Sequence, residues 1–365
     1  MQTIDDRIKE IEEEIRNTPY HKGTEHHIGK LKARIARLKE DKMEKTLKGS
    51  GGGGYAVRKT GDATVVLVGP PSVGKSTLLN QITNAQSRVG AYDFTTLNVV
   101  PGILDYKGAK IQIFDVPGIL SGAASGRGRG KEVLSVVRNA DLILIMVDVN
   151  TINMIPVILR ELYEAGIRLN EKKPEVTIIK QSCGGIKVNS TTALKLSYDT
   201  IKSLASEFRL TNAEIIIRED ITLDRLIDVF MGNRVYLPYL IIVNKIDLGE
   251  SKNLREYLPN DAVLVKISSQ DRRNLDELKE KIWEKLKFIR VYLKDQEKID
   301  YNSPFILRDG KTLADLLSEA SIRNKENFKS AKVFGSGAKY PGQEVSLTFV
   351  PGDGTIVQFL SKNSI

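Results

Sequence analysis

Gly69-Pro70-Pro71-Ser72-Val73-Gly74-Lys75-Ser76 follows directly on the apolar residues 65–68. This GxxxxGK[ST] spacing, placed between a strand and a helix, is typical of a loop whose backbone N–H groups and helix N-terminus surround a phosphate anion. In such a loop Lys75 reaches the outer phosphates and the Ser76 hydroxyl ligates Mg²⁺. The sequence therefore predicts a nucleoside triphosphate site that runs from Gly69 to Thr77.

A second motif, Asp115-Val116-Pro117-Gly118, follows the apolar residues 111–114. Its carboxylate is placed to hold Mg²⁺ through a water molecule, and the Gly118 N–H to reach a γ-phosphate. In the polar loop 90–96, Thr96 is predicted to complete the Mg²⁺ shell and to sense the γ-phosphate, with Thr95 as the alternate. The predicted catalytic residues are Lys75, Thr96 and Gly118, and the predicted metal ligands are Ser76, Thr96 and Asp115.

The base is predicted to be read by Asn244-Lys245-Ile246-Asp247, which follows the apolar residues 239–243. The Asp247 carboxylate can accept from both N–H donors on the guanine edge, whereas adenine would leave a buried carboxylate unpaired at high cost. Asn244 would tie this loop to the phosphate loop, and the Lys245 stem would cover the ring. Downstream, the turn at Ser268 and Ser269 is predicted to donate a backbone hydrogen bond to guanine O6. The site is therefore expected to bind GTP and GDP.

The composition sets wider bounds on the protein. The chain has 365 residues, a formal net charge of +9 and a pI near 9.3, which suggests an anionic partner such as nucleic acid, although such an excess also favours solubility. A single cysteine, Cys183, excludes an internal disulfide and fits a reducing cytoplasm. No apolar run approaches the roughly 20 residues of a membrane span. We expect a cytoplasmic monomer without a membrane segment.

Residues 1–48 are predicted to form a basic helical hairpin, because two apolar stripes at helical spacing flank Thr18-Pro19. The stripes comprise Ile4, Ile8, Ile11 and Ile15, then Ile28, Leu31, Ile35 and Leu38. The outer face of the second helix carries Lys30, Lys32, Arg34, Arg37, Lys39, Lys42, Lys45 and Lys48. This face is either solvated or in contact with a phosphate backbone, and we weigh the two equally.

Beyond a glycine-rich linker, 49–63, the pattern alternates strand and helix and predicts an α/β domain with a parallel sheet covered on both faces. This GTPase domain is assigned to 64–165 and 236–289, with strands at 64–68, 97–104, 110–114, 141–147, 239–243 and 262–267, and a closing helix at 274–288. An α+β insertion, 166–235, is predicted to contain a β-hairpin turning at Gly184-Gly185, helices at 198–208 and 222–230, and a strand at 214–217. Residues 290–365 are predicted to form a β-grasp domain.

Ile119 bears on the chemistry, because many GTPases carry glutamine directly after DxxG to orient the attacking water. Isoleucine cannot do this, so we expect a Mg²⁺-dependent GTPase with slow intrinsic turnover whose loops switch with the nucleotide. The alternative is a scaffold that binds GTP and barely hydrolyses it. A phosphotransferase is disfavoured, because no acceptor pocket or lid is evident.

Taken together, these motifs resemble the developmentally regulated GTP-binding proteins of the Obg-type translation-factor GTPases, over essentially the whole chain. The resemblance rests on GPPSVGKST at 69–77, YDFTTLNVVPG at 92–102, DVPG at 115–118, GRGRGKE at 126–132, NSTT at 189–192, RED at 218–220, MGNRVY at 231–236 and NKID at 244–247. It implies a helix-turn-helix N-terminus, an insertion like domain 2 of ribosomal protein S5, and a C-terminal TGS domain.

The resemblance further implies ribosome-associated GTPase activity in translation, often stimulated by K⁺, and a stabilising partner protein in eukaryotic members. The hydrophobic residue after DxxG, Ile119, looks like the family pattern. Some potassium-dependent relatives place asparagine where this chain has Ser72, which departs from the pattern of a K⁺ ligand. The spare C-terminus and short loops suggest an archaeal member.

Overall fold

The computed structural model describes residues 3–48, 61–83, 100–116, 136–249, 254–295, 298–319 and 328–361, with the backbone alone at 43–48, 100 and 101. Thr95, Thr96, Gly118 and Ile119 lie outside these ranges, as do residues 49–60 of the predicted linker. The described residues fall into two compact units, one made of 3–48 and 162–236 and the other of the remainder. We call them the first and the second unit.

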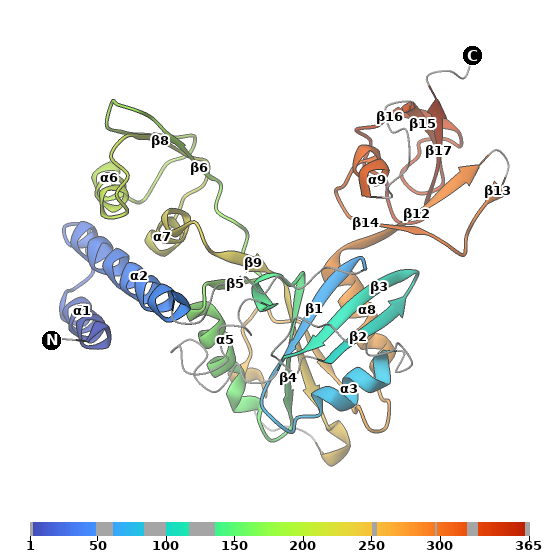
Figure 1. Ribbon diagram of the computed structural model, residues 1–365, viewed down its shortest axis with the longest axis horizontal. Coiled ribbons are helices and arrows are strands. Elements are labelled where there is room, and N and C mark those ends of the chain that lie inside the picture. Colours follow the sequence, from blue (N-terminus) through green and yellow to red (C-terminus); the bar gives the residue numbers. More distant parts are fainter. Residues whose placement is uncertain are drawn as a thin grey trace. The chain divides into compact units, whose positions relative to one another are not determined.

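A six-stranded sheet in the order β11-β10-β4-β1-β3-β2 forms the centre of the second unit (Figure 1). Its strands are β1 (Ala63–Val68), β2 (Val100–Tyr106), β3 (Ala109–Asp115), β4 (Leu142–Asp148), β10 (Tyr239–Asn244) and β11 (Leu264–Lys266). Each corresponds to a predicted strand. β1 pairs in parallel with β3 and β4, and β10 in parallel with β4 and β11. The strand ends that carry the motifs therefore meet at one edge of the sheet.

The expectation of an all-parallel sheet was wrong at β2, which pairs antiparallel with β3. Only Lys107 and Gly108 connect the two strands, and both have positive φ values, 51° and 88°. Two consecutive left-handed residues form the tight turn whose twist suits an antiparallel hairpin. A parallel partner would need a long crossover, for which this connection leaves no room.

Helices cover both faces of the sheet. On one face, α3 (Lys75–Ile82) and α8 (Leu275–Leu286) share a core with alternate strand residues such as Val65, Ile111 and Leu144. The intervening residues, including Ile143 and Ile145, are equally buried on the other face, on the side of α5 (Ile155–Glu164) (Figure 1). Continuous burial along β1, β4 and β10 is what a sheet covered on both sides requires.

Short helical turns join some of these elements. They are η1 (Ile152–Met154), η2 (Ile246–Leu248) and η3 (Leu254–Tyr257).

The rest of the second unit is a mixed sheet in the order β13-β12-β17-β15-β16, with β14 also pairing with β12. Its elements are β12 (Phe288–Asp295), β13 (Lys298–Ile299), β14 (Phe305–Arg308), α9 (Leu313–Glu319), β15 (Phe328–Phe334), β16 (Gln343–Ser346) and β17 (Thr355–Ser361). The predicted helix 274–288 was too long at its C-terminal end. Lys287 adopts a left-handed conformation with φ of 54°, which ends α8 at Leu286 and starts β12 at Phe288.

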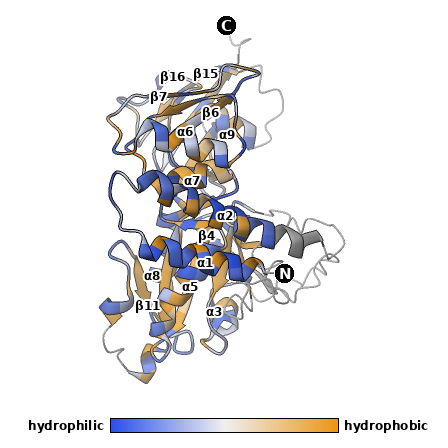
Figure 2. Ribbon diagram, turned by 90° about the vertical axis from the view of Figure 1, so that its left-hand side faces the viewer, coloured by the Kyte–Doolittle hydropathy of each residue, from blue (hydrophilic) through white to orange (hydrophobic). Residues whose placement is uncertain are grey.

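The first unit begins with α1 (Ile4–Asn17) and α2 (Glu25–Lys48), as the two stripes predicted. Thr3 caps α1 in a capping box with Asp6. Helix α2 contacts more than α1, because Ile28 of the stripe and the neighbouring Ala33 belong to a core with α6 (Tyr198–Glu207) and α7 (Leu223–Met231). Figure 2 shows both N-terminal helices as mainly hydrophilic. Within the described residues, no helix has the length and hydrophobicity to cross a membrane.

The basic face of α2 is partly exposed, as predicted for an outer face, but several of its charges are neutralised. Several of its cations pair with carboxylates of α1 or of residues after 166: Lys32 with Asp224 at 2.9 Å, Arg34 with Glu207 at 3.5 Å, Lys39 with Glu12 at 3.8 Å and Lys42 with Asp5 at 2.6 Å. A run of like charges in the sequence did not reveal these acidic neighbours, because they come from other helices.

The strands of the first unit correct a second expectation. β6 (Val176–Lys180) and β7 (Ile186–Ser190) were predicted to form a hairpin, but β8 (Ala213–Ile217) lies between them, antiparallel to β6 and parallel to β7. With Ile215 and Ile217 fully buried, β8 is the strand best suited to the central position. The helices predicted at 198–208 and 222–230 are present as α6 and α7, and Thr222 caps α7.

A buried ion pair anchors the end of the first unit. Arg168, in β5 (Ile167–Leu169), donates to both carboxylate oxygens of Asp228 at 2.6 and 2.7 Å, and both side chains are under a tenth exposed. Arg234, just before β9 (Val235–Leu237), also donates to Asp228 at 2.9 Å. The bidentate geometry and the second donor offset the cost of burying these charges.

Candidate guanine-nucleotide site

The phosphate loop after β1 is shaped by two glycines. A Cβ on Gly69 would stand 2.0 Å from the carbonyl oxygen of Met146 in β4. Gly74 has φ of +96°, and a Cβ there would stand 2.5 Å from Nδ2 of Asn244. Any side chain at either position would therefore displace the loop from the strand or from the base-reading motif, so glycine is required for the close approach of the three segments.

Lys75 is the first residue of α3 and is almost fully buried. Its ammonium donates to the carbonyl oxygens of Gly69 at 3.0 Å and Pro70 at 2.8 Å. Burial lowers the pKa of Lys75, and the nearby Asp115 partly opposes that shift. The loop thus holds the ammonium within its own curve, beside the N-terminus of α3, where an anionic phosphate is favoured.

Ser76 and Asp115 meet as the predicted metal site requires. The Ser76 hydroxyl donates to Oδ2 of Asp115 at 2.9 Å. The other carboxylate oxygen, Oδ1, is buried and has no hydrogen-bond partner among the described residues. A buried carboxylate oxygen with no partner is costly unless a water or a cation satisfies it, so this pair fits Mg²⁺.

Protein ligands alone would not enclose that ion. The described part of the chain contains no group of three or more His, Cys, Asp or Glu side chains able to hold a metal. Mg²⁺ commonly binds through one or two protein oxygens together with water and substrate phosphates, and the Ser76–Asp115 pair suits that mode.

Asn244 joins the base-reading motif to the phosphate loop, as predicted. Its side chain is buried, and Nδ2 donates to the Val73 carbonyl at 2.8 Å. Its Oδ1 accepts from the backbone N–H and the hydroxyl of Ser269 at 2.9 and 3.0 Å. The N–H of Ser269 therefore donates to Asn244 in this structure. That a backbone N–H of the turn at Ser268 and Ser269 donates to guanine O6 stays a prediction.

The next residue, Lys245, also connects the base-reading motif to the phosphate loop. It adopts φ of 61°, and its ammonium donates to the Ser72 carbonyl at 2.7 Å and to Oδ2 of Asp148 at 2.8 Å. The side chain is thus held extended across the loop, which suits a stem that covers one face of a planar base.

Asp148 was not predicted as a site residue. It is the last residue of β4, and its other oxygen, Oδ1, accepts from the Thr151 hydroxyl at 2.8 Å and from the Asn150 N–H at 3.1 Å. Burial acts to raise the pKa of Asp148, but hydrogen bonds from Lys245 and Thr151 outweigh it and hold the pKa below its usual value. The signal available in the sequence was an acidic residue that ends a fully apolar strand at the nucleotide edge of the sheet.

Asp247 is exposed at the end of the same motif, and a hydrogen bond from the Ser268 side chain lowers its pKa. The carboxylate is thus kept ionised and able to accept from two donors. Ser268 and Ser269 are both buried, which fixes the turn beneath it. The structure brings together the phosphate loop, Asp115, the base motif and this turn. Thr96 and Gly118 fall outside the described residues.

Asp148→Asn is expected to weaken GDP and GTP binding about tenfold, mainly through faster dissociation, because Lys245 loses the ionic partner that holds it across the loop. The measurement is the dissociation rate of a fluorescent GDP analogue. In a double-mutant cycle with Lys245→Met, the two losses should not add. Additive losses would show that Asp148 acts independently of Lys245.

Comparison with known families places these features in context. Residues 64–181 match the family model described as 50S ribosome-binding GTPase. Residues 183–288 match the one described as the C-terminal region of MMR_HSR1 domain. The matched ranges include the phosphate loop and Asp115 in the first and the base motif in the second.

Full-length relatives are similar throughout. An uncharacterized GTP-binding protein of Methanocaldococcus jannaschii is 52% identical, over 98% of this chain and 93% of its own. Developmentally-regulated GTP-binding protein 1 of Xenopus laevis is 43% identical, over 98% of each chain. Ribosome-interacting GTPase 1 of Saccharomyces cerevisiae is 41% identical, over 99% of this chain and 100% of its own.

Proposed function

The chain belongs to the family of developmentally regulated GTP-binding proteins, and we propose that it is a Mg²⁺-dependent GTPase that acts as a nucleotide-controlled switch on the ribosome. The observation that carries this proposal is the connection between its phosphate and base motifs. Asn244 and Lys245 donate to the carbonyls of Val73 and Ser72, so that the guanine-reading loop and the phosphate loop are held around one space.

The proposed reaction is the attack of water on the γ-phosphorus of GTP, with cleavage of the bond to the β-phosphate oxygen and release of GDP and phosphate. Bound Mg²⁺ would neutralise charge that develops on the β- and γ-phosphate oxygens. Ser76 and Asp115 are the residues placed to hold the ion, and Lys75 adds a fixed positive charge at the same phosphates. Thr96 and Gly118 are proposed to contact the γ-phosphate.

A slow intrinsic rate is part of the proposal. Ile119 has no group that can orient the water, so that task falls to the ribosome, to a protein partner or to the substrate phosphates. We further propose that K⁺ binds at the site. Some potassium-dependent relatives carry asparagine where this chain has Ser72, so the ligand that the phosphate loop offers K⁺ would differ here.

The ribosomal role is supported by the relative from Saccharomyces cerevisiae, which is named ribosome-interacting GTPase 1, and by the net charge of +9. We propose that the N-terminal hairpin is of the helix-turn-helix type, that residues 166–235 resemble ribosomal S5 domain 2, and that the C-terminal sheet is a TGS domain. These parts would contact ribosomal RNA or protein. We further propose a cytoplasmic monomer, stabilised by a partner protein.

Cosedimentation with ribosomes tests the switch. The protein loaded with a non-hydrolysable GTP analogue is expected to sediment with ribosomes at least about fivefold more than the protein loaded with GDP, because the triphosphate orders the loops that form the binding surface. Equal sedimentation in both states would contradict a nucleotide-controlled interaction.

A GTP-binding scaffold remains the second candidate, and Ile119 is the residue that favours it. Under this alternative, ribosomes bind the GTP form without accelerating turnover. Rapid hydrolysis on the ribosome would exclude it.

A further inference from the structure

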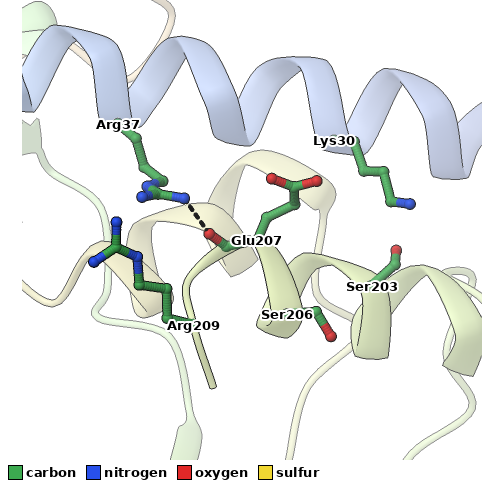
Figure 3. A pocket seen from close by; sticks show the side chains of 6 residues that line it. All are labelled: Lys30, Arg37, Ser203, Ser206, Glu207 and Arg209. Carbon is green, nitrogen blue, oxygen red and sulfur yellow. Dashed lines mark hydrogen bonds between the residues drawn. The ribbon is translucent and has the colours of Figure 1, made fainter. Parts of the chain in front are cut away.

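A cationic pocket of about 320 Å³ lies in the first unit, between α2 and the C-terminal end of α6. It is lined by Lys30, Arg37, Ser203, Ser206, Glu207 and Arg209. Figure 3 shows Lys30 and Arg37 extending from α2 over α6, with the guanidinium groups of Arg37 and Arg209 pointing toward one another. Three basic side chains against one carboxylate leave a formal charge of +2 on the lining.

The charges in this pocket are less neutralised than those on the rest of α2. Lys32, Lys39 and Lys42 each pair with a carboxylate. By contrast, neither Lys30 nor Arg209 has a hydrogen-bond or ion-pair acceptor for its side chain anywhere in the described ranges. Arg37 donates to the backbone carbonyl of Glu207, a neutral acceptor that leaves its charge uncompensated. The Glu207 carboxylate is itself within 3.5 Å of Arg34.

The backbone at the end of α6 sets the position of Arg209. This residue directly follows the C-cap residue Phe208 of α6 and has φ of 59°. Glycine is the usual residue at this position, because a left-handed conformation is unfavourable for residues that carry a Cβ. Other non-glycine residues of the described chain share this conformation, including Lys287 at the end of α8, so the backbone places the Arg209 guanidinium at the pocket and does not by itself point to a ligand.

The chemistry of the lining selects the ligand. The Ser203 and Ser206 hydroxyls donate to the carbonyls of Thr200 and Lys202, so the available donors are the cations. Two guanidinium groups facing one another repel, and a phosphate can bridge them, because its oxygens match the planar N–H forks of arginine. An apolar or cationic ligand would gain nothing from this arrangement.

We propose that this pocket binds a phosphate group, supplied by the backbone of an RNA. The lining by itself selects an oxyanion, because arginine forks match phosphate and carboxylate alike, whereas the choice of a phosphate from RNA rests on the proposed ribosomal function. Free phosphate is the other source of the same chemistry, and the experiment separates the two.

The test uses the full chain saturated with Mg²⁺ and GDP, so that the phosphate loop is already filled. Anisotropy of a fluorescein-labelled RNA hairpin gives the affinity over a series of salt concentrations for the wild type, Arg209→Gly and Lys187→Gln. Glycine tolerates the backbone of position 209, so this variant should fold. Lys187 is an exposed cation of β7, and its neighbours Ile186 and Val188 contact the core that contains α6, so its side chain points to the opposite face.

Arg209→Gly is expected to lower RNA affinity about fivefold and to reduce the slope of log affinity against log salt by about one, while Lys187→Gln leaves both nearly unchanged. Wild-type affinity and slope in Arg209→Gly would overturn RNA as the ligand. Calorimetry with inorganic phosphate then decides the source. Phosphate binding that Arg209→Gly loses, without an RNA effect, assigns the pocket to free phosphate.

Identical behaviour of Arg209→Gly and the wild type toward both RNA and phosphate overturns the pocket proposal. The ribosomal function would still stand in that case if the wild type cosediments with ribosomes in its GTP form. If the wild type does not cosediment with ribosomes in its GTP form, the ribosomal function is contradicted. The phosphate titration then decides alone whether the pocket binds an oxyanion.

Discussion

Lys75→Ala is expected to abolish measurable GTP hydrolysis and to weaken GTP binding at least about a hundredfold. The ammonium is the cation built into the phosphate loop, where it is held by the carbonyls of Gly69 and Pro70. No other described lysine or arginine side chain donates to these two carbonyls. Its burial already disfavours the charged form, as the lowered pKa shows, so removing it should not unfold the domain.

Equilibrium titration with a fluorescent GTP analogue and single-turnover hydrolysis measure the two effects separately. Lys332→Ala is the matched control, because Lys332 is an exposed lysine of β15 in the C-terminal sheet. The control should bind and hydrolyse GTP like the wild type. Wild-type hydrolysis by Lys75→Ala would refute the assignment of the phosphate loop.

Asp247→Asn is expected to lower GTP affinity by about a thousandfold and to make xanthosine triphosphate the preferred ligand. The carboxylate accepts from two donors of guanine, whereas an amide at this position can donate to the carbonyl that xanthine carries in place of the guanine amino group. The lowered pKa of Asp247, caused by the hydrogen bond from Ser268, keeps the wild-type group in the acceptor-only form that guanine needs.

Competition binding with GTP, xanthosine triphosphate and ATP gives the preference directly. Asp271→Asn makes the same change of charge at another exposed carboxylate, on the turn that follows Ser268, and should leave guanine preference intact. If Asp247→Asn still selects GTP over xanthosine triphosphate, the base is read by other residues.

Local sequence patterns predicted much of the nucleotide site. Phosphate binding needs a strand, a glycine loop and a helix in succession, so the order of residues 65–82 already describes the geometry. The contact between Asn244 and the phosphate loop was also predictable, because the first residue of the base-reading motif 244–247 is expected to tie that motif to the phosphate loop. Asp148 was not, since it belongs to no short motif and its partner Lys245 lies 97 positions away in the sequence.

Elsewhere, tertiary contacts decided what the sequence pattern left open. The Gly184-Gly185 turn favoured a hairpin of β6 and β7, but burial of the apolar β8 placed that strand between them. The ion pairs on the basic face of α2 were not predictable, because acidic partners such as Asp224 come from a distant helix. Conversely, the antiparallel course of β2 has a local cause in Lys107 and Gly108, which an α/β pattern alone does not reveal.

Single-turnover GTP hydrolysis in potassium buffer, with and without ribosomes from a matched source, tests the central claim most directly. ATP serves as the nucleotide control. A slow rate that ribosomes accelerate, for GTP and not for ATP, is the result expected of a guanine-specific switch that lacks its own water-orienting residue at Ile119. A rate that stays equally slow when ribosomes are bound would contradict the claim that this chain is a ribosome-activated GTPase.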